Sequence, residues 1–258
     1  MDSIVAEVKD LVNKGLKEAI LIAQDTTMYG SDLYGKPSLH ILCKKLAAIR
    51  GVRWIRIMYA HPAHVTDELI RTMSNEPKIC RYLDLPIQHG CDRILRSMRR
   101  KYSVNQLKKL VDILRRKIPG IAIRTSVIVG YPGETVSDFN KLVSLIKEER
   151  FTRLGVFKYS RESGTAAAKL GDQISERLKD KRFRKIMRLQ RSISRKCLKD
   201  MIGKVIMVLA EGHIGRSYMD APDIDGVVKI DKNVPHGKIV PVKITGSGFY
   251  DLSGKLVT

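Results

Sequence analysis

The 258-residue sequence lacks several patterns that would assign it to a familiar class of protein. No stretch approaches the ~20 apolar residues of a transmembrane helix, and the opening MDSIVAEVKDLV has the pattern of an acidic amphipathic helix, not of a signal peptide. Glycine-rich phosphate turns of the GxGxxG or GxxxxGKS kind are absent, which argues against a nucleotide-binding open sheet. We therefore expect a cytoplasmic protein with no membrane partner.

Cysteine is scarce, and its four positions are scattered. Cys43, Cys80, Cys91 and Cys197 form neither a CxxC pair nor the spacing of a disulfide framework. Such usage is typical of proteins in a reducing compartment. None of the four belongs to a compact cysteine motif of the kind that holds an iron–sulfur cluster.

Acidic residues are also few, at 27 Asp and Glu against 48 Lys and Arg, which gives a net charge of +21. A surplus of this size indicates a polyanionic partner, although a merely basic surface is the alternative. The surplus is densest in residues 177–199, where Ile186, Leu189, Ile193 and Cys197 recur at helical spacing among the cations. We predict a basic helix there, which either contacts RNA phosphates or only covers the side of the protein.

Apolar runs alternate with helical patterns up to about residue 200. The runs lie at 19–24, 54–60, 82–86, 122–130 and 154–160. Helical patterns begin near Asp2, Pro37, Thr66, Cys91, Val104, Thr135 and Ser175. Strands separated by helices predict an α/β fold with a parallel sheet, and polar residues after several strands favour a barrel over an open sheet. Five strands make such a barrel incomplete.

The sequence texture changes near residue 200. Short apolar runs at 204–211, 226–230, 239–246 and 251–257 are separated by Gly, Pro and Asp clusters. This pattern predicts a small all-β barrel. We expect two domains, at residues 1–199 and 200–258, and we expect the second to fold independently.

Six phrases, spread from residue 23 to residue 228, carry a family pattern. They are AQDTTMYGSDLYG (23–35), WIRIMYAHP (54–62), YLDLPIQHGCDRILRSMRR (82–100), RTSVIVGYPGET (124–135), LGVFKYSRESGT (154–165) and GRSYMDAPDIDGVV (215–228). In these phrases the chain resembles the radical S-adenosylmethionine (SAM) methylthiotransferases of the RimO type. Asp25 and the pair Gln88-His89 favour that type, because the tRNA-modifying relatives usually carry Asn and Gln-Ser there.

The resemblance implies a fold, an activity and partners. The fold is a TIM-like radical SAM (β/α)6 barrel that is incomplete here because its first unit is missing, followed by a small OB-like TRAM domain. The activity is methylthiolation of an aspartate in a small-subunit ribosomal protein, with SAM and two 4Fe-4S clusters as cofactors. The ribosomal protein or the ribosome would be the partner.

The resemblance also implies a cofactor site on the strand RTSVIVG. Arg124 and Ser126 share one side of this strand by period-two alternation, and Gly130 ends it. Arg124 would pair with the carboxylate of SAM, or else form a salt bridge inside the barrel. Gly130 would let the ligand approach the backbone.

Five further positions are candidates for binding SAM. Gln24 and Asp25 end a strand and could contact the methionine amine, while Gln88 could reach the ribose. Phe157 and Tyr159 could pack near the adenine, or they could belong to the core. We predict no metal site on the protein itself, because His61, His64, His89 and Cys91 fit no zinc spacing.

The cluster ligands of the family are absent from this sequence. The family holds one cluster on CxxxCxxC and another on three cysteines of an N-terminal domain, and neither motif occurs here. A truncated gene, a two-piece enzyme with a separate N-terminal cluster-bearing chain, and a cluster-less remnant are the three explanations. The chain is thus the C-terminal part of a methylthiotransferase, or an inactive module that binds the ribosome or RNA.

Three acidic residues of the second domain are candidates for substrate contact. Asp220, Asp223 and Asp225 lie in YMDAPDIDG, and in the family this domain meets the substrate protein. A basic ribosomal protein would attract such a cluster. The alternative is that the three carboxylates only cap turns.

Overall fold

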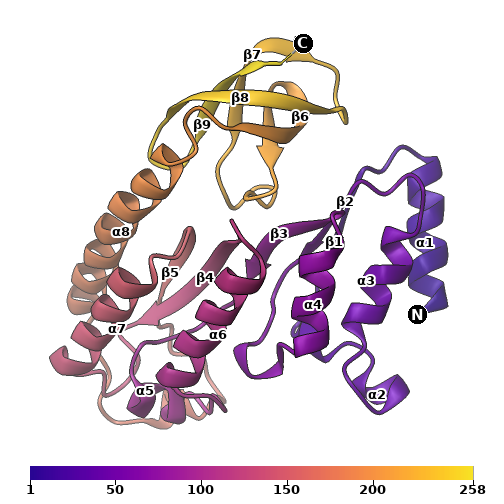
Figure 1. Cartoon of the computed structure of the whole chain (residues 1–258). Coiled ribbons are helices and arrows are strands. Elements are labelled where there is room, and N and C mark those ends of the chain that lie inside the picture. The colour runs from indigo at the N-terminus through magenta and orange to yellow at the C-terminus, as the bar shows by residue number, and fades with distance from the viewer. Residues whose placement is uncertain (258) are drawn as a thin grey trace.

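Five parallel strands form the sheet of the N-terminal domain in the computed structural model, which describes residues 1–257 (Figure 1). They are β1 (Glu18–Leu21), β2 (Trp54–Ile57), β3 (Ile79–Asp84), β4 (Ala122–Val129) and β5 (Arg153–Lys158), adjacent in chain order. Every neighbouring pair is parallel, so the predicted parallel α/β architecture is confirmed.

Helices precede or follow each strand. They are α1 (Asp2–Asn13), α2 (Ser31–Tyr34), α3 (Leu39–Ala47), α4 (Asp67–Asn75), α5 (Asp92–Ser97), α6 (Val104–Lys117), α7 (Val136–Glu149) and α8 (Glu176–Lys199). Short 3₁₀ turns η1 (Thr26–Met28), η2 (Pro62–His64) and η3 (Ala167–Lys169) lie in the loops. Ser103 and Thr135 form capping boxes with the third residue of their helices, which explains why α6 and α7 begin where they do.

The two faces of the sheet have different chemistry. On β4, Ile123, Val127 and Val129 belong to the apolar core with the helices, whereas Arg124 and Ser126 alternate with them and point to the other face. The helices therefore cover one face, and the polar face is the inner side of the curved sheet.

The C-terminal domain is a closed four-stranded barrel in the order β6-β7-β9-β8. Its strands are β6 (Val205–Ser217), β7 (Val228–Val234), β8 (Ile239–Ser247) and β9 (Leu252–Leu256). The predicted small all-β domain is thereby confirmed. The long helix α8 leads from the sheet to this barrel (Figure 1).

The two domains share one apolar cluster. Trp54, Tyr82 and Ala122 of the sheet pack with Val208 and Met219 of the small barrel. These sheet residues lie on the inner face, where Tyr82 pairs in register with Ala122 at the start of β4, so the small barrel covers that part of the sheet. Because of this shared core, the small barrel buries part of its apolar surface against the sheet. Independent folding of the second domain stays a prediction. Among the described residues, no helix is long and apolar enough to cross a membrane.

Candidate functional site

The carboxyl ends of the strands leave accessible polar groups on the inner face of the sheet. Gln24 follows β1, Gln88 follows β3, and Ser126 lies on β4, and all three are partly or fully exposed. Apolar side chains lie at the same ends, where Ile22 and Phe157 are 66% and 57% exposed. Exposed apolar and polar groups together suit a ligand that has both kinds of surface.

The backbone holds Gln88 directly beside β4. Gln88 N–H donates to the Ser126 carbonyl at 3.0 Å, and Ile128 N–H donates to the Gln88 carbonyl at 2.8 Å. Gln88 adopts a positive φ of 63°, an unusual conformation for a residue with a side chain. This local strain marks the position as one where side-chain direction matters. The structure therefore places Gln88 and Ser126, two separate candidates for the cofactor site, on adjacent backbone.

Gly130 ends β4 in a tight turn held by a buried carboxylate. Its φ is +74°, and its N–H, like that of Tyr131, donates to Glu134 Oε2. A Cβ at this position would lie 2.3 Å from Lys179 Cγ on α8. The predicted role of Gly130, close approach of a ligand, needs correction, because the space beside its Cα belongs to Lys179.

Glu134 is the centre of a buried cluster of polar side chains that was not predicted from the sequence. Burial raises its pKa, while Arg182 on α8, 3.1 Å away, favours its charged form. His89 is fully buried beside it, and burial lowers the pKa of the imidazole to about 4. His89 Nδ1 accepts a hydrogen bond from the Cys91 N–H at 3.1 Å, so His89 supports the loop after β3 as a neutral ring.

Arg124 is engaged by protein carboxylates. Its guanidinium lies 2.8 Å from Asp84 on β3 and 3.5 Å from Asp225 of the small barrel. Desolvation works against its charge, but the two aspartates outweigh it and raise the pKa of Arg124. Of the two predicted roles, the salt bridge inside the barrel is the one present in this structure.

The acidic cluster of the second domain also faces inward. Asp220 is 1% exposed and pairs with Arg153 on β5, and Asp225 accepts a hydrogen bond from the Tyr82 hydroxyl at 2.8 Å. The prediction that Asp220 and Asp225 contact a substrate protein is therefore wrong, because their carboxylates are buried against the sheet. Asp223 alone of the three is exposed.

A further cluster of ion pairs joins β1 and β2 to the small barrel. Arg56 is fully buried, lies 2.7 Å from Glu18, and donates to the carbonyls of Ser217 and Tyr218. Arg216 of the small barrel binds the other oxygen of Glu18 at 2.6 Å. No sequence pattern predicts these ion pairs, because their members lie up to 198 positions apart in the chain.

The two aromatic candidates on β5 separate. Tyr159 is 9% exposed and packs edge-on against Tyr131 with 5.5 Å between ring centroids. Of its two predicted roles, Tyr159 has the one in the core. Its prediction as a residue that packs near the adenine of the cofactor is therefore corrected. Phe157 stays accessible on the inner face, and a Cβ at Gly155 would lie 3.5 Å from its ring.

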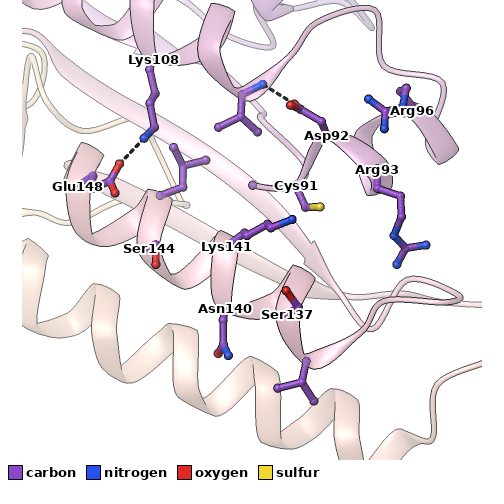
Figure 2. Close-up of a pocket in the computed structure, with 14 residues that line it drawn as sticks. Cys91, Asp92, Arg93, Arg96, Lys108, Ser137, Asn140, Lys141, Ser144 and Glu148 are labelled. Atoms are coloured by element: carbon purple, nitrogen blue, oxygen red, sulfur yellow. Dashed lines mark hydrogen bonds and ion pairs between the residues drawn. The ribbon is translucent and has the colours of Figure 1, made fainter.

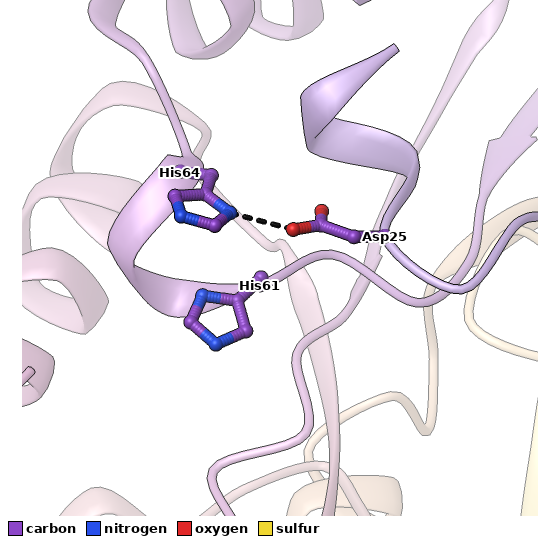
Figure 3. Close-up of side chains that lie close together, drawn as sticks. All are labelled: Asp25, His61 and His64. Atoms are coloured by element: carbon purple, nitrogen blue, oxygen red, sulfur yellow. Dashed lines mark hydrogen bonds and ion pairs between the residues drawn. The ribbon is translucent and has the colours of Figure 1, made fainter. Parts of the chain in front are cut away.

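Both carboxylate oxygens of Asp25 have partners within the protein, so neither is available to a ligand amine in this structure. Its Oδ1 accepts a hydrogen bond from Thr27 N–H at 3.0 Å, and its Oδ2 lies 2.5 Å from His64 Nδ1 (Figure 3). His61 stacks on His64 with 4.5 Å between ring centroids. Asp25, His61 and His64 thus form a group that could hold a metal ion, whereas His89 and Cys91 lie elsewhere. The four residues weighed as a metal site in the sequence do not come together, whereas two of them, His61 and His64, meet Asp25.

A separate cavity of about 900 Å³ lies among α5, α6 and α7 (Figure 2). Its lining includes Arg93, Arg96 and Lys141, and Lys108 pairs with Glu148 at its edge. None of the predicted cofactor residues lines it. It lies in the helical layer, so we do not assign the cofactor there.

Comparison with protein families gives matches in both domains. Residues 1–146 match the Radical SAM superfamily, and residues 202–257 match the TRAM domain. A solved radical SAM methyltransferase, TsrM from Kitasatospora setae, has a similar fold with a TM-score of 0.50 and 17% identity, covering 62% of this chain and 29% of that protein.

Two curated relatives are similar along the whole chain. The ribosomal protein uS12 methylthiotransferase RimO of Citrifermentans bemidjiense is 50% identical over 99% of this chain. The protein of the same name from Geobacter sulfurreducens is 49% identical over 100% of it. The chain spans 59% and 60% of the lengths of these two relatives.

Proposed function

Since this chain belongs to the radical SAM superfamily, we propose that it forms the barrel and TRAM portion of a RimO-type enzyme that methylthiolates an aspartate of ribosomal protein uS12. The observation that carries the proposal is the inner face of the sheet, which leaves Gln24, Gln88, Ser126 and Phe157 accessible at one edge. The similarity to the two uS12 methylthiotransferases supports the substrate. Modification of a ribosomal protein would place the chain in the cytoplasm.

The accessible residues fit SAM by chemistry. The amide groups of Gln24 and Gln88 and the hydroxyl of Ser126 can bond the polar groups of the ligand, and Phe157 offers a flat apolar surface. SAM, when bound at an iron–sulfur cluster, supplies the radical that abstracts hydrogen. The chain's own residues would bind and orient the ligand, and the ion pair of Arg124 and Asp84 would keep β3 and β4 in register below it.

We further propose that the cluster ligands come from a segment that is not part of this sequence. Cys43 and Cys80 are buried, and burial raises the pKa of each thiol to about 12, which disfavours the thiolate that a cluster needs. Within residues 1–257, β1 pairs only with β2. A groove of about 580 Å³ between α1 and the free side of β1 is lined by Val8, Ile20 and other apolar side chains. A further strand that carries the cysteines would fit there.

The test is reconstitution in two pieces. The chain is mixed anaerobically with the N-terminal portion of a RimO relative, iron, sulfide and SAM, and a uS12 peptide is analysed by mass spectrometry. We expect methylthiolated peptide from the mixture and none from the chain alone. Gln88→Ala should lower the yield about tenfold, while Asn140→Ala in the outer cavity should not. A full yield from Gln88→Ala would contradict the assigned site, and no product from any mixture would contradict the function.

The exposed face of α8 favours a second candidate function, RNA binding by an inactive module. Arg191 and Arg195 lie over the ring of Phe249 at 3.5 and 5.2 Å, next to a cavity of about 620 Å³ that is also lined by Lys196 and Lys199. Exposed cations around an accessible aromatic ring suit the phosphates and bases of RNA.

Salt dependence distinguishes this function from a helix that only covers the sheet. Neutralising Arg184, Arg188, Arg191 and Arg195 together should weaken RNA binding and flatten its dependence on salt, because each phosphate contact releases a counterion. Lys179 and Arg182 are buried, so they are excluded from the RNA-binding set. Unchanged affinity and slope would leave α8 with a structural role only.

A further inference from the structure

The loops after β1 and β2 converge on three potential ligands at the carboxyl edge of the sheet (Figure 3). One ligand atom each from Asp25, His61 and His64 lies within 4.8 Å of the other two. All three residues are partly exposed, so an ion can reach them from solvent. The group is compact, accessible and composed only of residue types that bind metals.

The surrounding backbone fixes two of these side chains in place. Asp25 caps η1 through the Thr27 N–H, which occupies Oδ1 and leaves Oδ2 toward His64. His61 caps η2 by accepting a hydrogen bond from the Ala63 N–H at 3.3 Å. The His61 N–H donates to Thr27 Oγ1 at 3.2 Å and so ties the two loops together. The ligands are therefore held near each other before any ion arrives.

The donor set selects among ions. Two imidazoles and one carboxylate suit zinc and its neighbours, whereas magnesium and calcium prefer oxygen ligands alone. Three protein ligands on zinc leave a fourth position open for water or another ligand. Zinc at about 2.0–2.1 Å from each ligand needs ligand atoms a little over 3 Å apart. Here Asp25 Oδ2 and His64 Nδ1 are 2.5 Å apart and all three ligand atoms lie within 4.8 Å of one another, so the side chains would adjust on binding the ion.

The Tyr102 ring packs edge-on against His61 with 5.5 Å between ring centroids, so it supports the position of the imidazole and adds no charge to the group.

We propose that Asp25, His61 and His64 form a binding site for one zinc ion, with an open coordination position at the carboxyl edge of the sheet. The site stands on the positions of these three side chains and does not depend on the proposed activity. It is distinct from any iron–sulfur cluster, because it contains no thiolate.

Titration calorimetry of the complete, chelator-treated chain with zinc chloride tests the proposal. We expect one ion per chain, and at least tenfold weaker binding in His61→Ala and His64→Asn. His64→Asn is informative because an amide can keep the hydrogen bond to Asp25 but is a poor zinc ligand. His213→Asn and Cys197→Ser, which change an exposed histidine and a partly exposed thiol, are the matched controls and should bind as the unmodified chain does.

Cobalt substitution identifies the donor atoms. We expect visible bands of four-coordinate cobalt without the near-ultraviolet charge-transfer band that a thiolate ligand produces. Thermal unfolding without metal shows whether each variant is folded, and added zinc should raise the melting temperature of the controls but not of His64→Asn. Absence of zinc binding, a thiolate band, or zinc affinity in His61→Ala and His64→Asn equal to that of the unmodified chain would overturn the proposal.

Discussion

Individual residues show why charge on this protein cannot be interpreted from local sequence. Arg124 and Ser126 were predicted to share a face of β4, and the structure has them so, because strand alternation is a local property. The partners of Arg124 are not local, since Asp84 and Asp225 lie on another strand and in another domain. The same holds for Asp25, whose proximity to His64 depends on two loops that meet only in the folded chain.

Asp220 and Asp223 provide a matched pair for testing the buried ion pairs. Asp220→Asn removes the partner of Arg153, which is 4% exposed, so we expect a loss of about 3 kcal/mol in the free energy of unfolding. Asp223→Asn, at an exposed turn with a φ of 65° that Asn tolerates, should change it by less than about 0.5 kcal/mol. Urea unfolding measures both, and equal effects would refute the assigned roles.

His89 should make stability depend on pH. Its pKa is about 4 in the folded chain and ~6.5 when unfolded, so the unfolded state binds more protons as pH falls through this window. The contribution of His89 is complete above pH ~6.5, and we expect about 2 kcal/mol of it to disappear between pH 7 and pH 5.

His89→Asn is the test of this dependence. The Asn side chain offers an acceptor for the Cys91 N–H but cannot be protonated, so its unfolding free energy should vary less between pH 7 and pH 5 than that of the unmodified chain. The exposed His213 gives a control substitution, His213→Asn, that should keep the original pH dependence. Parallel curves for His89→Asn and the unmodified chain would contradict the prediction.

At the scale of elements, strands and helix starts were predictable and helix faces were not. Period-two runs and capping residues such as Thr66, Thr135 and Ser175 are local signals, and each caps the helix that follows it. The basic helix α8 was expected to bury only an apolar stripe. Lys179 and Arg182 are also buried, because Tyr159 O and Glu134 offer them partners that lie on other elements.

The contact between the β4 turn and α8 can be tested through Gly130. Gly130→Ala introduces a Cβ at a φ of +74° and against Lys179 Cγ, whereas Gly237→Ala does so at +77° with no atom within 4 Å. Both variants carry the conformational strain of about 1 kcal/mol, so the excess loss in Gly130→Ala reports the packing. We expect an excess of 1–3 kcal/mol, by order of magnitude, in urea unfolding. No excess would mean that α8 shifts freely.

For the whole molecule, the sequence patterns before and after residue 200 predicted the two folds but not the contact between the two domains. The change near residue 200 marked the end of α8, which the structure places at Lys199. The apolar cluster that the two domains share around Trp54 and Tyr82 could not be predicted, because the sequence pattern at both residues is that of any buried strand.

This shared core predicts a single unfolding transition. Trp54 is the only tryptophan, and it lies where the two domains meet, so its fluorescence reports the junction. In urea, the fluorescence and the far-ultraviolet circular dichroism should change at the same midpoint, as expected for one cooperative unit. Residues 200–258 produced alone should be less stable than in the complete chain. Two separated transitions would show instead that the domains unfold independently.

Strand β4 has one more consequence through the bond from Arg124 to Asp225. The same strand carries Ser126 at the proposed ligand edge, so we expect ligand occupancy there and the position of the small barrel to be thermodynamically linked. If ligand occupancy changes the affinity of the small barrel for its macromolecular partner by some factor, that partner must change the affinity for the ligand by the same factor. Binding of a small ligand at this edge and docking of the small barrel on a macromolecule would then be reciprocal events, coupled through a strand eight residues long.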